Sequence, residues 1–168
     1  MKLERVLRYI DAFTKWQGYI ISFLCITLIG ITLVDIVGRQ LGFYTAWAFD
    51  IEWFQYSALL MLSLGYGILR QAHVRIDLVT SRFSPRVQSF LIAFSYIAFV
   101  IPFTILITKY AWDFGMISKM TNETTLTAWH GTLWPVKFLI FIGFCLMIPQ
   151  CFAELIRHTI FVFKRERP

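Results

Sequence analysis

Four long segments of this sequence carry no charged residue, and they constrain the fold more than any other feature. The uncharged runs cover residues 16–34, 53–69, 87–108 and 138–153. A helix that crosses a bilayer needs roughly 20 apolar residues, and each run reaches that length with its flanks. Lipid cannot satisfy backbone hydrogen bonds, so a spanning segment must be a helix or part of a closed barrel. None of the runs alternates as a barrel strand does, and we therefore predict four transmembrane helices.

The composition supports the same fold class. Hydrophobic residues make up 58% of the chain and charged residues only 15%, whereas a soluble domain carries about a quarter charged residues. No internal repeat or linker-like segment divides the sequence. We therefore predict an all-α integral membrane protein with a single four-helix membrane domain over residues 1–168. Its spans are expected at about 16–38, 47–69, 87–109 and 134–156.

The basic residues predict the orientation of the chain. Twelve of the sixteen fall before the first span, between spans two and three, or after span four. These twelve are Lys2, Arg5, Arg8, Lys15, Arg70, Arg75, Arg82, Arg86, Arg157, Lys164, Arg165 and Arg167. Cytoplasmic segments collect Lys and Arg, so we expect both termini in the cytoplasm. The same placement explains the net charge of +6 without a nucleic-acid partner.

The residues before the first span predict a separate helix at the membrane surface. Within 2–14, apolar residues recur at the helical spacing, and basic residues occupy the other side. The apolar positions are Leu3, Val6, Leu7 and Ile10. We expect an amphipathic helix that lies in the cytoplasmic interface, with its basic face toward lipid headgroups. A plain cytoplasmic leader is the alternative.

Ionisable residues occur near the outer ends of the predicted spans, and they define the candidate polar sites. Asp35 and Arg39 are four residues apart and can pair along one helix face. Glu52, which lies one to two turns into span two, could pair with Lys137 at the start of span four. Because no charged group lies at the bilayer centre, we expect structural or subunit-contact roles and no ion coupling.

The sequence offers no pattern for a cofactor or for catalysis. His73, His130 and His158 lie outside the apolar runs or at their ends, where they could not hold a haem between helices. The three cysteines have no metal-ligand spacing. We therefore expect no cofactor, no metal, no catalytic or substrate-binding residue and no enzymatic activity. Pro102 and Pro149 fall within spans and are expected to bend them.

A complete secondary carrier usually shows inverted repeats and broken helices around a midplane site. This chain shows neither, and apart from span two its spans are rich in Phe, Ile and Leu. Such large apolar side chains suit contact with lipid or with another membrane subunit. The sequence therefore indicates an accessory subunit and not a complete permease.

Two segments then show a resemblance to a known family. The first, EWFQYSALLMLSLGYGILRQAHVRIDLV, has an acidic residue opening span two, glycines near the end of that span, and then a basic residue and a His-Val-Arg-Ile-Asp stretch. The second, NETTLTAWHGTLWPVKFLIFIGFCLMIPQCFAELIR, has Glu123, a Trp134–Pro135 pair and Gln150. Together they resemble the small membrane subunit, the DctQ-type or Q subunit, of TRAP (tripartite ATP-independent periplasmic) transporters.

The resemblance implies a set of partners and a location. The chain would be a multi-pass protein of a bacterial inner membrane, and it would join a large TRAP membrane subunit and a periplasmic substrate-binding protein in sodium-coupled uptake of an organic acid. The implied subunit-interface or structural residues are Glu52, Arg70, His73, Arg75, Asp77, Trp134 and Lys137. The expected docking residues for the binding protein are Glu123, Asp113 and Lys119.

Two other functions remain open on the sequence alone. The chain could anchor a respiratory complex in the membrane, with or without haem. It could also be a small proton-coupled exporter that works as an oligomer, in which case Glu52 would be its proton site. Neither alternative accounts for the His-Val-Arg-Ile-Asp stretch at 73–77.

Overall fold

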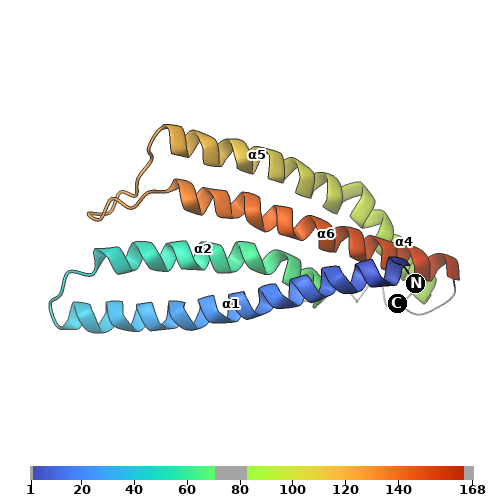
Figure 1. Ribbon diagram of the computed structural model, residues 1–168, viewed down its shortest axis with the longest axis horizontal. Coiled ribbons are helices and arrows are strands. Elements are labelled where there is room, and N and C mark those ends of the chain that lie inside the picture. Colours follow the sequence, from blue (N-terminus) through green and yellow to red (C-terminus); the bar gives the residue numbers. More distant parts are fainter. Residues whose placement is uncertain (1, 71–82, 165–168) are drawn as a thin grey trace.

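The protein folds into four long helical rods (Figure 1). The computed structural model describes residues 2–70 and 83–164. The first two rods are α1 (Lys2–Gln40) and α2 (Ala46–Leu69). The third is composed of α4 (Pro85–Ser95), a π-helical turn (Tyr96–Val100) and α5 (Ile101–Met120), and the fourth is α6 (Trp134–Lys164). The described residues thus confirm the predicted all-helical class.

The rods lie side by side in an open row, in the order α1, α2, α6, α5 (Figure 1). Helix α2 packs on α1 and α6, while α6 packs on α2, α4 and α5. Because the row is one helix thick, large apolar side chains stay exposed on its faces. Phe23, Ile26, Phe99 and Tyr110 are all at least 60% exposed. The row therefore leaves a broad apolar surface for lipid or for another protein.

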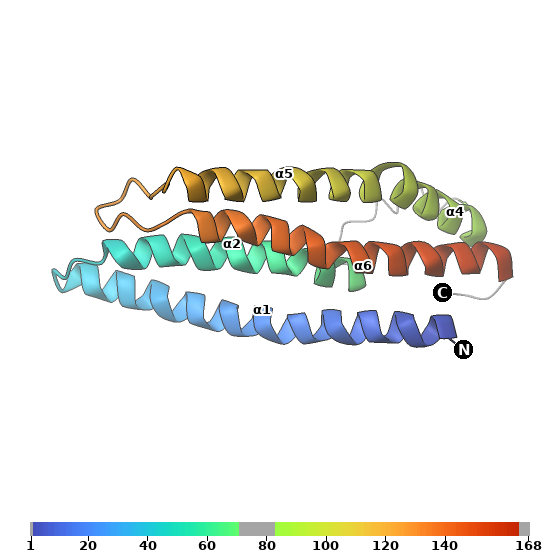
Figure 2. The same cartoon turned by 45° about the horizontal axis from the view of Figure 1, so that its top comes forward.

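Both chain ends lie at one end of the row, and this end is called the terminal end below (Figures 1 and 2). The opposite end, called the loop end, carries the connections 41–45 and 121–133. Within residues 2–70 and 83–164, three stretches are long and apolar enough to cross a membrane: Leu3–Gln40, Pro85–Met120 and Trp134–Phe163. Helix α2 is not one of them, although its 24 residues would measure about 36 Å.

The predicted interfacial helix is wrong as a separate element. Residues 2–14 continue into the first span without a break, so α1 has 39 residues. Near the terminal end, α1 passes alongside α6 (Figure 2), and the side chains of Leu7 and Thr14 are buried there. Leu3 and Val6 instead remain about half exposed. Contacts with α6 hold this segment as a continuous extension of α1.

Two turns at the loop end are set by residues with positive φ. Helix α1 ends at Gln40, Gly42 just beyond it has a φ of 79°, and the amide of Phe43 then donates to the carbonyl of Gly38 at 2.9 Å. Helix α5 ends at Met120 and is followed in the same way by Asn122, whose φ is 48°, with the amide of Glu123 donating to the carbonyl of Ser118 at 3.1 Å. Glycine and asparagine are the residues that tolerate this left-handed conformation at a helix end.

The two prolines within spans have different surroundings. The π-helical turn Tyr96–Val100 directly precedes Ile101 and Pro102, and α4 meets α5 at an angle there (Figure 2). A π turn absorbs the register change where proline removes a backbone donor. The predicted bend near Pro102 therefore agrees with the structure. Pro149 lies inside α6, which continues as one helix.

Small residues let the central helices approach closely. A Cβ atom added to Gly143 of α6 would lie 2.6 Å from the carbonyl oxygen of Met61 in α2. A Cβ on Gly65 of α2 would lie 3.3 Å from the carbonyl oxygen of Leu146 in α6. Membrane helices commonly associate through such small residues, because backbones can then approach each other. The α2–α6 contact is thus specified by glycine on both sides.

This geometry predicts the effect of Gly143→Ala. The new methyl group would meet backbone, which cannot rotate away, so the substitution should destabilise the fold by about 1–3 kcal/mol. Thermal unfolding of the purified protein in mild detergent measures the change. Gly30→Ala is the matched control, because nothing lies within 4 Å of a Cβ at that position of α1. Equal melting temperatures for the two variants would contradict the proposed close packing.

Candidate functional site

A buried carboxylate fixes the longer connection at the loop end. Asp50 of α2 is 3% exposed. The hydroxyl of Thr125 donates to its Oδ2 at 2.7 Å, and the hydroxyl of Thr127 donates to the same atom. Hydrogen bonds to a charged acceptor are stronger than neutral ones. Asp50 therefore ties the middle of the 121–133 connection to the start of α2.

The connection also has internal order. Thr124 and Thr132 form an antiparallel bridge, and the amide of Thr125 donates to the carbonyl of Gly131 at 2.8 Å. Between these strand-like segments the side chain of Leu126 is fully exposed. The connection is thus a small hairpin, and the side chains of Leu126, Ala128 and Trp129 are exposed on it.

A second link joins the hairpin to α6. The ammonium of Lys137 forms a hydrogen-bonded ion pair with Glu123, and it lies 4.0 Å from the centre of the Phe114 ring. The hydrogen bond from Lys137 holds the pKa of Glu123 below its ordinary value. The suggested pairing of Lys137 with Glu52 is therefore wrong, because Lys137 reaches the nearer loop carboxylate. Lys119 lies 5.5 Å from the centre of the Trp134 ring, and Asp113 is exposed on α5.

A polar network joins α1 and α6 at the terminal end. The guanidinium of Arg157 in α6 donates to both Glu154 and Asp11, and the latter belongs to α1. One turn nearer the loop end, the hydroxyl of Thr14 donates to the side-chain oxygen of Gln150 at 3.1 Å. Thr14 and Gln150 are both almost completely buried. Buried polar pairs of this kind fix the register of two apolar helices.

Part of the predicted cluster at 70–77 can be placed. The Nε of Arg70 donates to the hydroxyl of Tyr66 at 2.9 Å, and its guanidinium lies 5.4 Å from the centre of the same ring. His73, Arg75 and Asp77 lie outside the described residues. Their role as a subunit contact remains a prediction.

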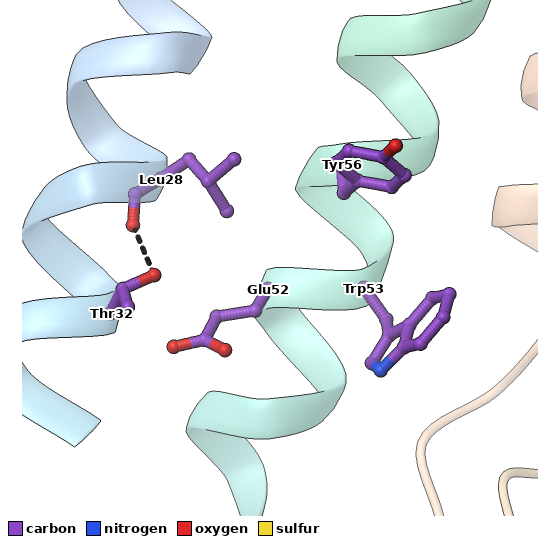
Figure 3. A pocket seen from close by; sticks show the side chains of 5 residues that line it. All are labelled: Leu28, Thr32, Glu52, Trp53 and Tyr56. Carbon is purple, nitrogen blue, oxygen red and sulfur yellow. Dashed lines mark hydrogen bonds between the residues drawn. The ribbon is translucent and has the colours of Figure 1, made fainter. Parts of the chain in front are cut away.

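Asp35, Arg39 and Glu52 are charged residues of α1 and α2, and Glu52 lines a groove between these two helices. The predicted pair of Asp35 and Arg39 is confirmed, with Arg39 Nε donating to Asp35 Oδ1 at 3.0 Å. Glu52 projects from α2 toward α1, into a groove of 420 Å³ (Figure 3). Its Oε1 is buried and has no hydrogen-bond partner among the described residues. Glu52 is thus separate from the Lys137 link.

Two of these polar centres were not identified from the sequence. Asp50 is only two positions from Glu52, yet the two carboxylates point to different neighbours. Asp11 and Arg157 looked like ordinary charges flanking spans. One sequence feature could have indicated this pair. An acid near the start of the first helix can face a base near the end of the last helix when the two helices are antiparallel.

These features define a helical membrane protein whose polar groups hold its own helices and loop together and whose apolar faces remain open. Residues 28–160 match the family described as tripartite ATP-independent periplasmic transporters, DctQ component. The match covers most of the chain, and the protein belongs to this family of transporter components. No curated protein matches the sequence. The resemblance to DctQ-type small subunits is therefore confirmed.

The Asp50 cluster predicts that Asp50→Asn loosens the hairpin. Both threonine hydroxyls donate to one oxygen of Asp50, and the neutral amide oxygen of asparagine would be a weaker acceptor for both of them. Hydrogen bonds to charged groups contribute about 1.5–3 kcal/mol, so the amides of 123–133 should exchange at least about tenfold faster. Hydrogen exchange read by mass spectrometry measures this. Asp113→Asn is the control, and equal exchange in both variants would refute the role of Asp50.

The Glu123–Lys137 link predicts a pH dependence. Because the folded-state pKa of Glu123 is lowered, the link contributes stability above the unfolded pKa, which is about 4.3. That contribution should be lost only as the pH falls through the lower, folded pKa. A carboxyl-carbon NMR titration of Glu123 in detergent should give a midpoint below the ordinary glutamate value. Lys137→Met should raise the midpoint of the Glu123 titration toward the ordinary glutamate value. A normal midpoint in the unmodified protein would contradict the link.

Proposed function

We propose that this chain is the small accessory subunit of a TRAP transporter, in which it joins a large membrane carrier subunit and a periplasmic binding protein. The complex would take up an organic acid with sodium coupling. Membership of the DctQ family supports this assignment. The observation that carries it is the open row of helices, because an apolar surface on both faces suits a scaffold that packs against a larger membrane protein.

We further propose that all four rods cross a bacterial inner membrane, with both termini in the cytoplasm. The common location of the two termini is consistent with an even number of crossings (Figure 1). The clustering of Lys and Arg in the segments at this end supports a cytoplasmic location. The loop end would then face the periplasm and the binding protein.

In this arrangement the chain supplies a scaffold and no transport site. Glu123 and Lys137 pair with each other, so their proposed contribution is to shape the hairpin. Asp113 and Lys119, both exposed on α5, together with the exposed Leu126 of the hairpin, are proposed to meet the binding protein. Trp134 supports this surface from the start of α6. Arg70, His73, Arg75 and Asp77 are proposed to contact the large subunit.

Co-purification tests the proposed function. The chain is expressed with its neighbouring genes, tagged at its C-terminus and extracted in mild detergent, and the associated proteins are identified by mass spectrometry. We expect a multispanning carrier in an equimolar amount, because both faces of the row require cover. A chain that purifies alone, or with a soluble dehydrogenase, would overturn the assignment and favour an exporter or a respiratory anchor.

A further inference from the structure

The groove between α1 and α2 is lined by polar and aromatic side chains. It is lined by Leu28 and Thr32 from α1 and by Glu52, Trp53 and Tyr56 from α2 (Figure 3). Trp53 is 57% exposed and Tyr56 is 52% exposed. The hydroxyl of Thr32 is directed to the carbonyl of Leu28 at 3.0 Å. The side chain of Glu52 therefore supplies the ionisable group that faces into the groove.

The charges around this groove do not balance among the described residues. Arg39 interacts electrostatically with Glu52, but its guanidinium is hydrogen bonded to Asp35. Two carboxylates thus share one guanidinium. Lys137, the other basic residue considered for Glu52, is occupied by Glu123. A carboxylate in a membrane-spanning layer is costly unless it is paired, so the groove lacks one cation.

We propose that the groove binds a lysine or arginine side chain from a membrane-embedded helix of the large carrier subunit. This inference rests on the proposed function. Charge complementarity selects a cationic group, and the exposed ring of Tyr56, which also lines the groove, can contact its ammonium or guanidinium through its face. Aromatic side chains and arginine dominate the energetic centres of protein interfaces. The groove would be such a centre.

Depth favours a protein side chain over a lipid amine. Glu52 follows the start of α2 by six residues, which places it about 9 Å along the helix axis. A basic side chain on a neighbouring helix can approach the groove sideways at that depth. A lipid amine would have to leave the headgroup layer to reach the same carboxylate. The occupant is therefore assigned to the partner subunit.

The test compares retention of the large subunit by the unmodified protein and by Glu52→Gln. Removing one member of a buried interfacial charge pair should weaken association roughly ten- to hundredfold, seen as loss of the carrier during detergent washes. Asp113→Asn is the matched control, since it removes an exposed carboxylate from α5. The isolated Glu52→Gln subunit should melt no lower than the unmodified one, because Glu52 Oε1 has no described partner within the chain to lose.

Photocrosslinking identifies the occupant. A photoreactive phenylalanine at Tyr56 should crosslink to a carrier segment that contains a lysine or arginine, and charge reversal of that residue should rescue Glu52→Lys. The same probe at Phe103, on α5, should not reach that segment. Crosslinks to lipid alone, or full retention of the carrier by Glu52→Gln, would overturn the inference while leaving the proposed function intact. Failure of the unmodified chain to retain the carrier would overturn both.

Discussion

The helices form a layer only one helix thick, and the rest of the structure depends on this constraint. In a closed bundle, each helix would hide an apolar stripe from its surroundings. Here α2 and α6 are covered on two sides, and α1 and α5 form the edges. The few fully buried side chains are small or polar, among them Thr104, Ser118 and Cys151. Lipid can cover such faces as well as protein can, so shape must come from a small number of directed contacts.

Those directed contacts lie at the two ends of the row and at its centre. At the loop end, Asp50 and the Glu123–Lys137 pair fix the hairpin. At the terminal end, Arg157 joins α1 to α6. Between them, glycine on α2 and α6 brings the backbones together. In lipid the hydrophobic effect does not drive helices together. Hydrogen bonds in an apolar environment and close backbone contacts are the forces that remain.

The sequence was sufficient for the features that depend on composition and local spacing. Uncharged runs predicted helices, the spacing of Asp35 and Arg39 predicted their pair, and Pro102 predicted a bend. Long-range features were not accessible in the same way. Periodicity in 2–14 cannot distinguish a helix on the membrane surface from an extension of α1, because the choice depends on partners in α6. The sequence suggested Glu52 as the partner of Lys137. In the structure the turn at Asn122 brings Glu123 within reach of Lys137 instead.

The length of α1 has a mechanical consequence. Its 39 residues measure about 58 Å, against a hydrocarbon thickness of about 30 Å. Even a tilt of about 40°, the upper end of the usual range, would use only about 39 Å of the helix. Roughly 19 Å of a spanning α1 would therefore lie beyond the hydrocarbon layer, and the contacts of Asp11 and Thr14 attach the first part of the helix to α6. Two helices that are joined in this way resist a change of tilt better than a single helix does. The extension of α1 would therefore brace the layer of helices against tilting when a neighbouring protein moves.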